Sequence, residues 1–178
     1  MRWILDDGPF AELAEVSGRS DQCDFTGYTN SDILISSTTA HSARSSTYRE
    51  RLLELYRSDG KRLVEVFEVL FGGDDPAERV LQDLHGEERT PTNLAEREAI
   101  AWALVHGKDA VFVTADKRAA LTALAELGRQ RVAHPFDLWL DLRQERVLEA
   151  ADFRLLCERS RRRDQGLERM PGRVARFF

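Results

Sequence analysis

Two aspartates follow predicted strands, in places where open α/β proteins usually bind ligands. Asp6 directly follows the apolar run at residues 3–5, and Asp116 stands two residues beyond the run at residues 110–114. Short apolar runs that end in turn-forming residues predict buried strands of a parallel sheet. Because ligand sites form beyond the carboxyl ends of such strands, we expect both carboxylates at one edge of the sheet.

A glutamate is expected to join them from a helix. Asn93 begins a predicted helix that runs to about His106, with Gly107 as its C-cap, and Glu96 lies in its first turn. Four residues advance a helix by only about 40°, so Glu96 shares a face with the apolar Ile100, and we expect that face to pack on the sheet. Glu98 lies about 200° away around the helix and is expected to point outward.

Asp6, Glu96 and Asp116 together predict a metal site whose ligands are also its catalytic residues. Carboxylates that converge repel one another and are costly to desolvate unless a cation is present. Oxygen ligands without cysteine or histidine select Mg²⁺ or Mn²⁺. Two such ions can activate water for attack on a phosphodiester and stabilise the departing oxygen. Hydrolysis of RNA or DNA is therefore the chemistry that these residues favour.

The elements that must position these acids alternate between strands and helices. Predicted strands cover residues 3–5, 32–37, 110–114 and 131–134. Predicted helices cover residues 10–16, 93–106 and 117–127, and two more lie within residues 136–163. A helical insert is expected at about residues 47–85, with helix starts at Thr47 and Asp75 and an apolar helical segment at 63–71. This order indicates an α/β sandwich around a mostly parallel sheet of about four to five strands. Residues 1–134 would form this unit, with residues 135–178 as a basic, helical C-terminal extension packed on it.

Composition narrows the class of protein. The net charge of −5 is unevenly spread, because residues 159–178 hold seven arginines against two acids. No apolar stretch approaches the roughly 20 residues that span a bilayer, and the start shows no secretory pattern, so we expect a cytoplasmic protein without membrane contact. Two distant cysteines and four scattered histidines disfavour a zinc site.

Three short segments resemble the acidic motifs of PIN-domain ribonucleases. Residues 4–10 (Ile-Leu-Asp-Asp-Gly-Pro-Phe) look like the opening strand, residues 94–101 (Leu-Ala-Glu-Arg-Glu-Ala-Ile-Ala) resemble the helix that carries the third acid, and residues 113–120 (Val-Thr-Ala-Asp-Lys-Arg-Ala-Ala) are similar to the last acidic motif. The resemblance implies a PIN-like α/β/α sandwich and a Mg²⁺- or Mn²⁺-dependent endoribonuclease, often the toxin of a toxin–antitoxin pair. It also implies metal-binding roles for Asp6, Glu96 and Asp116.

One position departs from that family. PIN domains usually carry a glutamate on the helix after the second strand, whereas residues 36–44 contain no acid here. Glu50 or Glu54 on the next predicted helix could substitute, the insert could have reshaped the site, or the chain could have kept the fold and lost catalysis. The long extension after Pro135 also departs from a minimal toxin.

Several of these residues have simpler structural interpretations. Asn93 and Glu96 match a capping box, and Asp116 could cap the helix that follows it. Asp7 is interpreted as a cap or a supporting residue beside the metal ligands, and Thr114 as another supporting residue. Candidate contacts to nucleic acid are Arg118, Arg161, Arg162 and Arg163, because a guanidinium suits phosphate.

Three functions therefore compete. The first is a nuclease with RNA as its partner, together with a small antitoxin protein and a second copy of the chain. The second is a catalytically silent PIN fold that only binds partners. The third is a receiver-like phosphoacceptor module, which would need an aspartate at the end of a middle strand where the sequence has Ser36 and Ser37.

Overall fold

A single five-stranded sheet forms the centre of the protein, whose structure is a computed structural model. The structure describes residues 2–17, 33–44, 64–69, 72–86, 93–145 and 148–163. The strands are β1 (Arg2–Leu5), β2 (Ile33–Ser36), β3 (Val64–Phe67), β4 (Ala110–Val113) and β5 (Val132–Ala133). All neighbouring pairs are parallel, in the order β3-β2-β1-β4-β5. The predicted α/β class and parallel sheet are confirmed.

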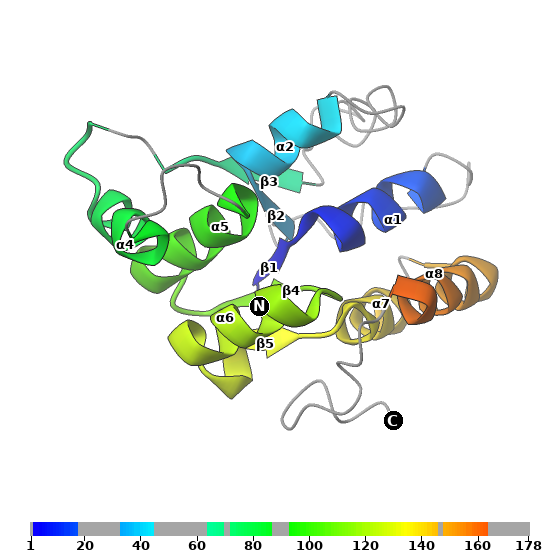
Figure 1. The fold of residues 1–178 in the computed structure, drawn as a ribbon. Coiled ribbons are helices and arrows are strands. Elements are labelled where there is room, and N and C mark those ends of the chain that lie inside the picture. The colour runs from blue at the N-terminus through cyan, green and yellow to red at the C-terminus, as the bar shows by residue number, and fades with distance from the viewer. Residues whose placement is uncertain are drawn as a thin grey trace.

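Helices cover both faces of the sheet and make a three-layered sandwich (Figure 1). One face carries α1 (Asp7–Ser17), α7 (Pro135–Gln144) and α8 (Ala150–Arg163). The other carries α5 (Leu94–Val105) and α6 (Lys117–Leu127), with α4 (Pro76–His85) packed outside α5. The short helix α2 (Ser37–Arg44) follows β2, and a 3₁₀ turn, η3 (Arg129–Arg131), leads into β5.

The central strand shows why the short apolar run forms a buried strand. Trp3 and Leu5 point into the cluster made with α1, α7 and α8, whereas Ile4 points into the cluster made with α5 and α6. Successive side chains alternate between the two faces of a strand, and both faces here are covered by helices. All three side chains are fully buried.

The prediction of a helix at residues 63–71 was wrong, because residues 64–67 form β3. Val64 and Phe67 are buried, while Glu65 between them is exposed at the edge of the sheet. A short run of β-branched and aromatic residues cannot be assigned from periodicity alone, and its pairing with β2 decides the outcome. The predicted helical insert therefore contains a strand. The helix start at Thr47 lies outside the described residues.

Helix boundaries agree with most of the predicted signals. Asp75 caps α4 by accepting from the Ala77 N–H at 2.9 Å, and proline follows at the first helical position. The C-cap of α5 is His106, one residue before Gly107, which was the predicted cap. The reason for a glycine there is packing, since a Cβ at position 107 would lie 2.6 Å from the Trp102 ring.

Two helices follow β5, as predicted, and both join the core. Leu138, Trp139 and Leu142 of α7 and Leu156 of α8 are fully buried in the cluster that also contains Trp3 and Leu13. Among the described residues, no helix combines the length and the apolar composition needed to cross a membrane.

Candidate active site

The strand order reverses between β1 and β4, and we call the region at the carboxyl ends of these two strands the crevice. From β1 the chain proceeds to β2 and β3 on one side, and β4 and β5 lie on the other. The helix after β1, α1, therefore covers one face, and the helix after β4, α6, covers the opposite face. Where the order reverses in this way, the loops at the carboxyl ends of the two strands separate and leave room for a ligand. Asp6 and Asp116 lie in these two loops.

Asp6 is held at the end of β1 by backbone and side-chain contacts. Its N–H donates to the Val113 carbonyl at 3.1 Å, which continues the β1–β4 ladder. Its Oδ1 accepts from the Asp7 N–H at 2.8 Å and its Oδ2 from the Thr114 hydroxyl at 2.6 Å. Burial raises the pKa of Asp6, these hydrogen bonds lower it, and the charges of Asp7 and Asp116 raise it further.

Asp116 caps α6, as its simpler interpretation predicts. Its Oδ1 accepts from the N–H groups of Arg118 at 2.7 Å and Ala119 at 3.0 Å. Its own N–H donates to the Thr114 Oγ1 at 3.0 Å, so one hydroxyl touches both aspartates. The cap fixes the carboxylate at the crevice beside Asp6, because the cap residue of α6 is also the last residue of the β4 loop.

Glu96 reaches the same crevice from α5. Burial raises its pKa to about 7, the charges of Asp6 and Asp116 raise it as well, and a hydrogen bond with Thr122 and the charge of Arg97 lower it. The capping-box interpretation is wrong, since Asn93 adopts a left-handed conformation with φ 59° and its side chain caps nothing. Glu96 lies close enough to Asp6 and Asp116 for the charge of each to raise its pKa.

Glu98 was predicted to point outward, and this prediction was wrong. Its side chain is only 3% exposed. Oε1 accepts from the Ser37 hydroxyl at 2.9 Å and the Val69 N–H at 3.1 Å, and Oε2 accepts from the Thr38 N–H at 3.1 Å. Helix α5 is covered on two sides, by the sheet and by α4, so positions well away from the sheet-facing side are also buried. The small residues Ala99, Ala101 and Ala103 were the sequence signal for this close packing.

The helix that carries the second acid in PIN domains carries hydroxyls here. The Thr39 hydroxyl forms a hydrogen bond with Asp7, whose pKa is raised by burial and lowered by this bond. Asp7 is the first residue of α1. Glu50 and Glu54, the proposed substitutes, lie outside the described residues, so the second acid is still unassigned.

The donors at the crevice suit a hard cation, although they do not form a closed cage. All three side chains offer carboxylate oxygen, and the charges of Asp6 and Asp116 raise the pKa of Glu96, an effect that a cation would offset. Within the described ranges, no three His, Cys, Asp or Glu side chains are arranged to hold one ion together. Mg²⁺ usually binds through one or two carboxylates and keeps several waters, so the donor set fits Mg²⁺ or Mn²⁺.

A separate open cleft lies between α2, β3 and the start of α5. Its volume is 620 Å³, and its walls mix the polar Thr38 and His41 with the apolar Val66 and Leu94. Thr39, which contacts Asp7, lies between two residues of this wall, Thr38 and Ala40. The lining also includes the acidic Glu68 and none of Asp6, Glu96 and Asp116, so this cleft is not assigned to the carboxylate site.

The four candidate arginines lie in different surroundings. Arg118 is in the first turn of α6, directly beside the Asp116 carboxylate that its N–H contacts. Arg161 lies over the Phe136 ring at 5.8 Å, and Arg162 pairs with Glu158 on its own helix. Arg163 instead crosses to the first turn of α1.

Comparisons of the chain with protein-family models, with curated proteins and with solved structures gave no match. The resemblance to PIN domains therefore rests only on the three short acidic segments. Any functional conclusion depends on the geometry of the crevice itself.

Proposed function

We propose that this chain is a divalent-metal-dependent nuclease that hydrolyses phosphodiester bonds in RNA, with Asp6, Glu96 and Asp116 as its metal-binding acids. The observation that supports this most is the pKa of Glu96, which burial and the nearby charges of Asp6 and Asp116 raise to about 7. Perturbed carboxyl groups of this kind cluster at catalytic sites.

The protein side chains have separate tasks in this proposal. When bound, Mg²⁺ or Mn²⁺ supplies Lewis acidity and lowers the pKa of a water molecule. Asp6 and Asp116 provide fixed carboxylates, because Thr114 and the α6 cap hold them in place. Glu96 would be the third carboxylate, and a bound cation would favour loss of the proton that its raised pKa of about 7 otherwise retains near neutral pH.

The resemblance to PIN domains extends the proposal to partners and location. An endoribonuclease of that type acts in the cytoplasm, often as the toxin of a pair, and is then covered by a small antitoxin protein. Copurification of a short protein encoded beside this one tests that part independently of any cleavage assay.

A catalytically silent fold of the same type is the second candidate. It is favoured by the lack of any acid in α2, Ser-Thr-Thr-Ala-His-Ser-Ala-Arg, and by the lack of a closed three-ligand group in the described part of the chain. A receiver-like module is disfavoured, because flavodoxin-like proteins of that kind have the strand order 2-1-3-4-5 rather than 3-2-1-4-5.

The proposal is tested by RNA cleavage in Mn²⁺, with EDTA as the metal-free control. Asp116→Asn is the informative variant, because asparagine also caps helices well and the fold is kept while the charge is lost. Asp109→Asn is the matched control, since Asp109 is exposed and directly precedes β4, at the opposite end of the strand from Asp116. We expect cleavage by the wild type and by Asp109→Asn, and none by Asp116→Asn. Equal cleavage by all three proteins would rule out this site.

A further inference from the structure

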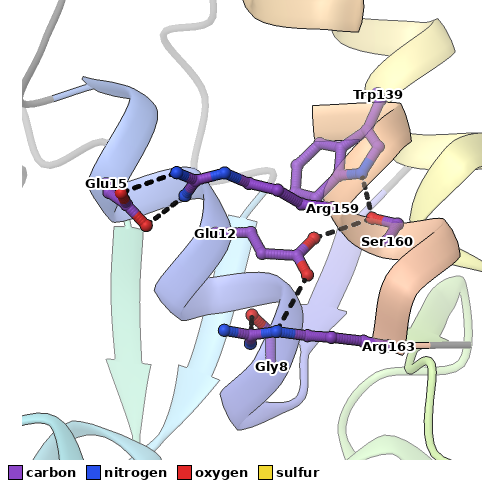
Figure 2. A network of polar contacts seen from close by, with 7 residues as sticks. All are labelled: Gly8, Glu12, Glu15, Trp139, Arg159, Ser160 and Arg163. Atoms are coloured by element: carbon purple, nitrogen blue, oxygen red, sulfur yellow. Dashed lines mark hydrogen bonds and ion pairs between the residues drawn. The ribbon is translucent and has the colours of Figure 1, made fainter. Parts of the chain in front are cut away.

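A network of polar contacts joins α1 to α8, which are far apart in the sequence (Figure 2). Arg159 of α8 forms a two-point ion pair with Glu15 of α1. One α8 turn further on, Arg163 lies 3.4 Å from the Glu12 carboxylate and donates to the Gly8 carbonyl at 3.3 Å. The two helices are therefore antiparallel, and the carboxyl end of α8 meets the amino end of α1.

Glu12 is the centre of this network and is almost fully buried, with 2% of its surface exposed. It accepts a 2.7 Å hydrogen bond from the buried Ser160 hydroxyl, which in turn accepts one of 2.9 Å from the Trp139 ring N–H. Burial raises the pKa of Glu12, while Ser160, Arg163 and Arg159 lower it. A carboxylate taken out of water is costly unless it is paired, so this one fixes the position of its partner guanidinium.

Arg163 is held against the first turn of α1, the helix that begins directly after Asp6. Gly8, whose carbonyl it contacts, is two residues from Asp6 and next to Asp7 in the first turn of α1. The Arg163 side chain is nevertheless 49% exposed. A guanidinium has five N–H donors, and the contacts to Glu12 and Gly8 occupy only the Nε and Nη1 groups. The Nη2 group extends the same planar fork and suits a phosphate.

The neighbouring arginines do not share this position. Arg161 covers the Phe136 ring on the wall of a different hollow, between α7 and α8. Arg162 is mostly exposed and pairs within its own helix with Glu158. The basic end of α8 therefore directs one of these three side chains to the first turn of α1, which follows Asp6.

We propose that Arg163 binds a backbone phosphate of single-stranded RNA next to the acidic crevice, with Glu12 and Ser160 as the residues that position it. The inference rests on the proposed function, because it concerns the substrate of the same site. It assigns to α8 a part in substrate binding. A cation at this point also counteracts the repulsion between RNA phosphates and the four carboxylates Asp6, Asp7, Glu96 and Asp116.

RNA binding tests this directly, with fluorescence anisotropy of a labelled single-stranded RNA in Ca²⁺ and a gel to verify that the RNA is intact. Arg163→Gln is compared with Arg162→Gln and Arg159→Gln, which remove the same charge from the same helix. Arg159→Gln also breaks an α1–α8 ion pair, but farther from the crevice. We expect Arg163→Gln to weaken binding roughly fivefold and to reduce the slope of log affinity against log salt by about 0.7, the value for one phosphate contact on a single strand.

The two control variants should bind RNA within about twofold of the wild type. If Arg163→Gln and Arg159→Gln weaken binding equally, Arg163 serves only to join the helices and the inference is wrong. Absence of RNA binding by the wild type also overturns it. If the wild type binds RNA through Arg163 but does not cleave it in Mn²⁺, the proposed catalysis fails while the phosphate contact stands.

Discussion

The Thr114 hydroxyl donates a 2.6 Å hydrogen bond to the Asp6 carboxylate across the crevice between β1 and β4. The same oxygen accepts from the Asp116 N–H at 3.0 Å. One buried side chain thus sets the position of both aspartates, although they are 110 residues apart in the sequence. The hydroxyl does so without adding charge to an already acidic site.

Removal of this hydroxyl should disturb the site more than the fold. Thr114→Val keeps the shape of the side chain but leaves Asp6 without its donor, and Thr114→Ser keeps the donor. Residues that orient metal-binding carboxylates typically contribute about 10- to 100-fold to activity or metal affinity. We expect that loss in kcat/KM for RNA cleavage by the valine variant and near wild-type activity for serine. A serine variant as inactive as the valine variant would contradict the role of the hydrogen bond.

Glu96 should make the metal-free protein less stable as the pH rises. Its pKa in the folded protein is about 7, above the ordinary value of 4.5. Between these values the folded state binds more protons than the unfolded state, so the free energy of unfolding falls as pH increases through this window. Urea unfolding in EDTA should show a steeper fall between pH 5 and pH 8 for the wild type than for Glu96→Gln. Parallel curves for the two proteins would show that the pKa of Glu96 is not raised.

The sequence predicted the central strands well because their residues are buried on both faces. Residues 3–5 and 110–113 are continuous apolar runs that only a covered parallel strand explains. β3 was missed because it lies at the edge of the sheet, where one exposed residue, Glu65, breaks the run. Its assignment depends on pairing with β2, which no local pattern contains.

The candidate site was predictable only in part. Asp6 and Asp116 were placed by their strands, and the sheet order brings them together. Glu98 was misplaced because a helical wheel assumes one buried face, whereas α5 has two. Glu12 gave no local signal, since its partners Ser160 and Arg163 are about 150 residues away and only tertiary packing joins them.

Glu98 should matter for stability rather than for chemistry. Its two oxygens accept three hydrogen bonds that join α5 to the start of α2 and to the end of β3. In Glu98→Gln the amide nitrogen cannot accept from the Thr38 N–H, and a buried donor loses its partner. We expect a loss of roughly 2 kcal/mol in the free energy of unfolding. Glu65→Gln, at an exposed position on β3, should change it by less than about 0.5 kcal/mol, and equal effects would contradict this role.

Arg131 should likewise stabilise the turn that leads into β4. Its guanidinium donates to the carbonyls of Ala103 at 2.7 Å, Gly107 at 2.5 Å and Ala110 at 3.1 Å. Arg131→Met removes these donors and should lower the free energy of unfolding by roughly 2 kcal/mol. The exposed Arg129→Met is the control, and chemical denaturation of both variants measures the difference. If Arg131→Met lowered the free energy of unfolding no more than Arg129→Met does, water would fully replace the guanidinium as the donor to these carbonyls.

Metal binding by the three acids is the central claim, and a Mn²⁺ titration followed by electron paramagnetic resonance tests it most directly. The wild type and Asp109→Asn should bind Mn²⁺ with the same affinity, because Asp109 lies at the amino end of β4, whereas the acids lie beyond the carboxyl ends of the strands. Asp6→Asn and Asp116→Asn should each weaken binding by at least about tenfold. Equal Mn²⁺ affinity in all four proteins would show that these carboxylates hold no ion.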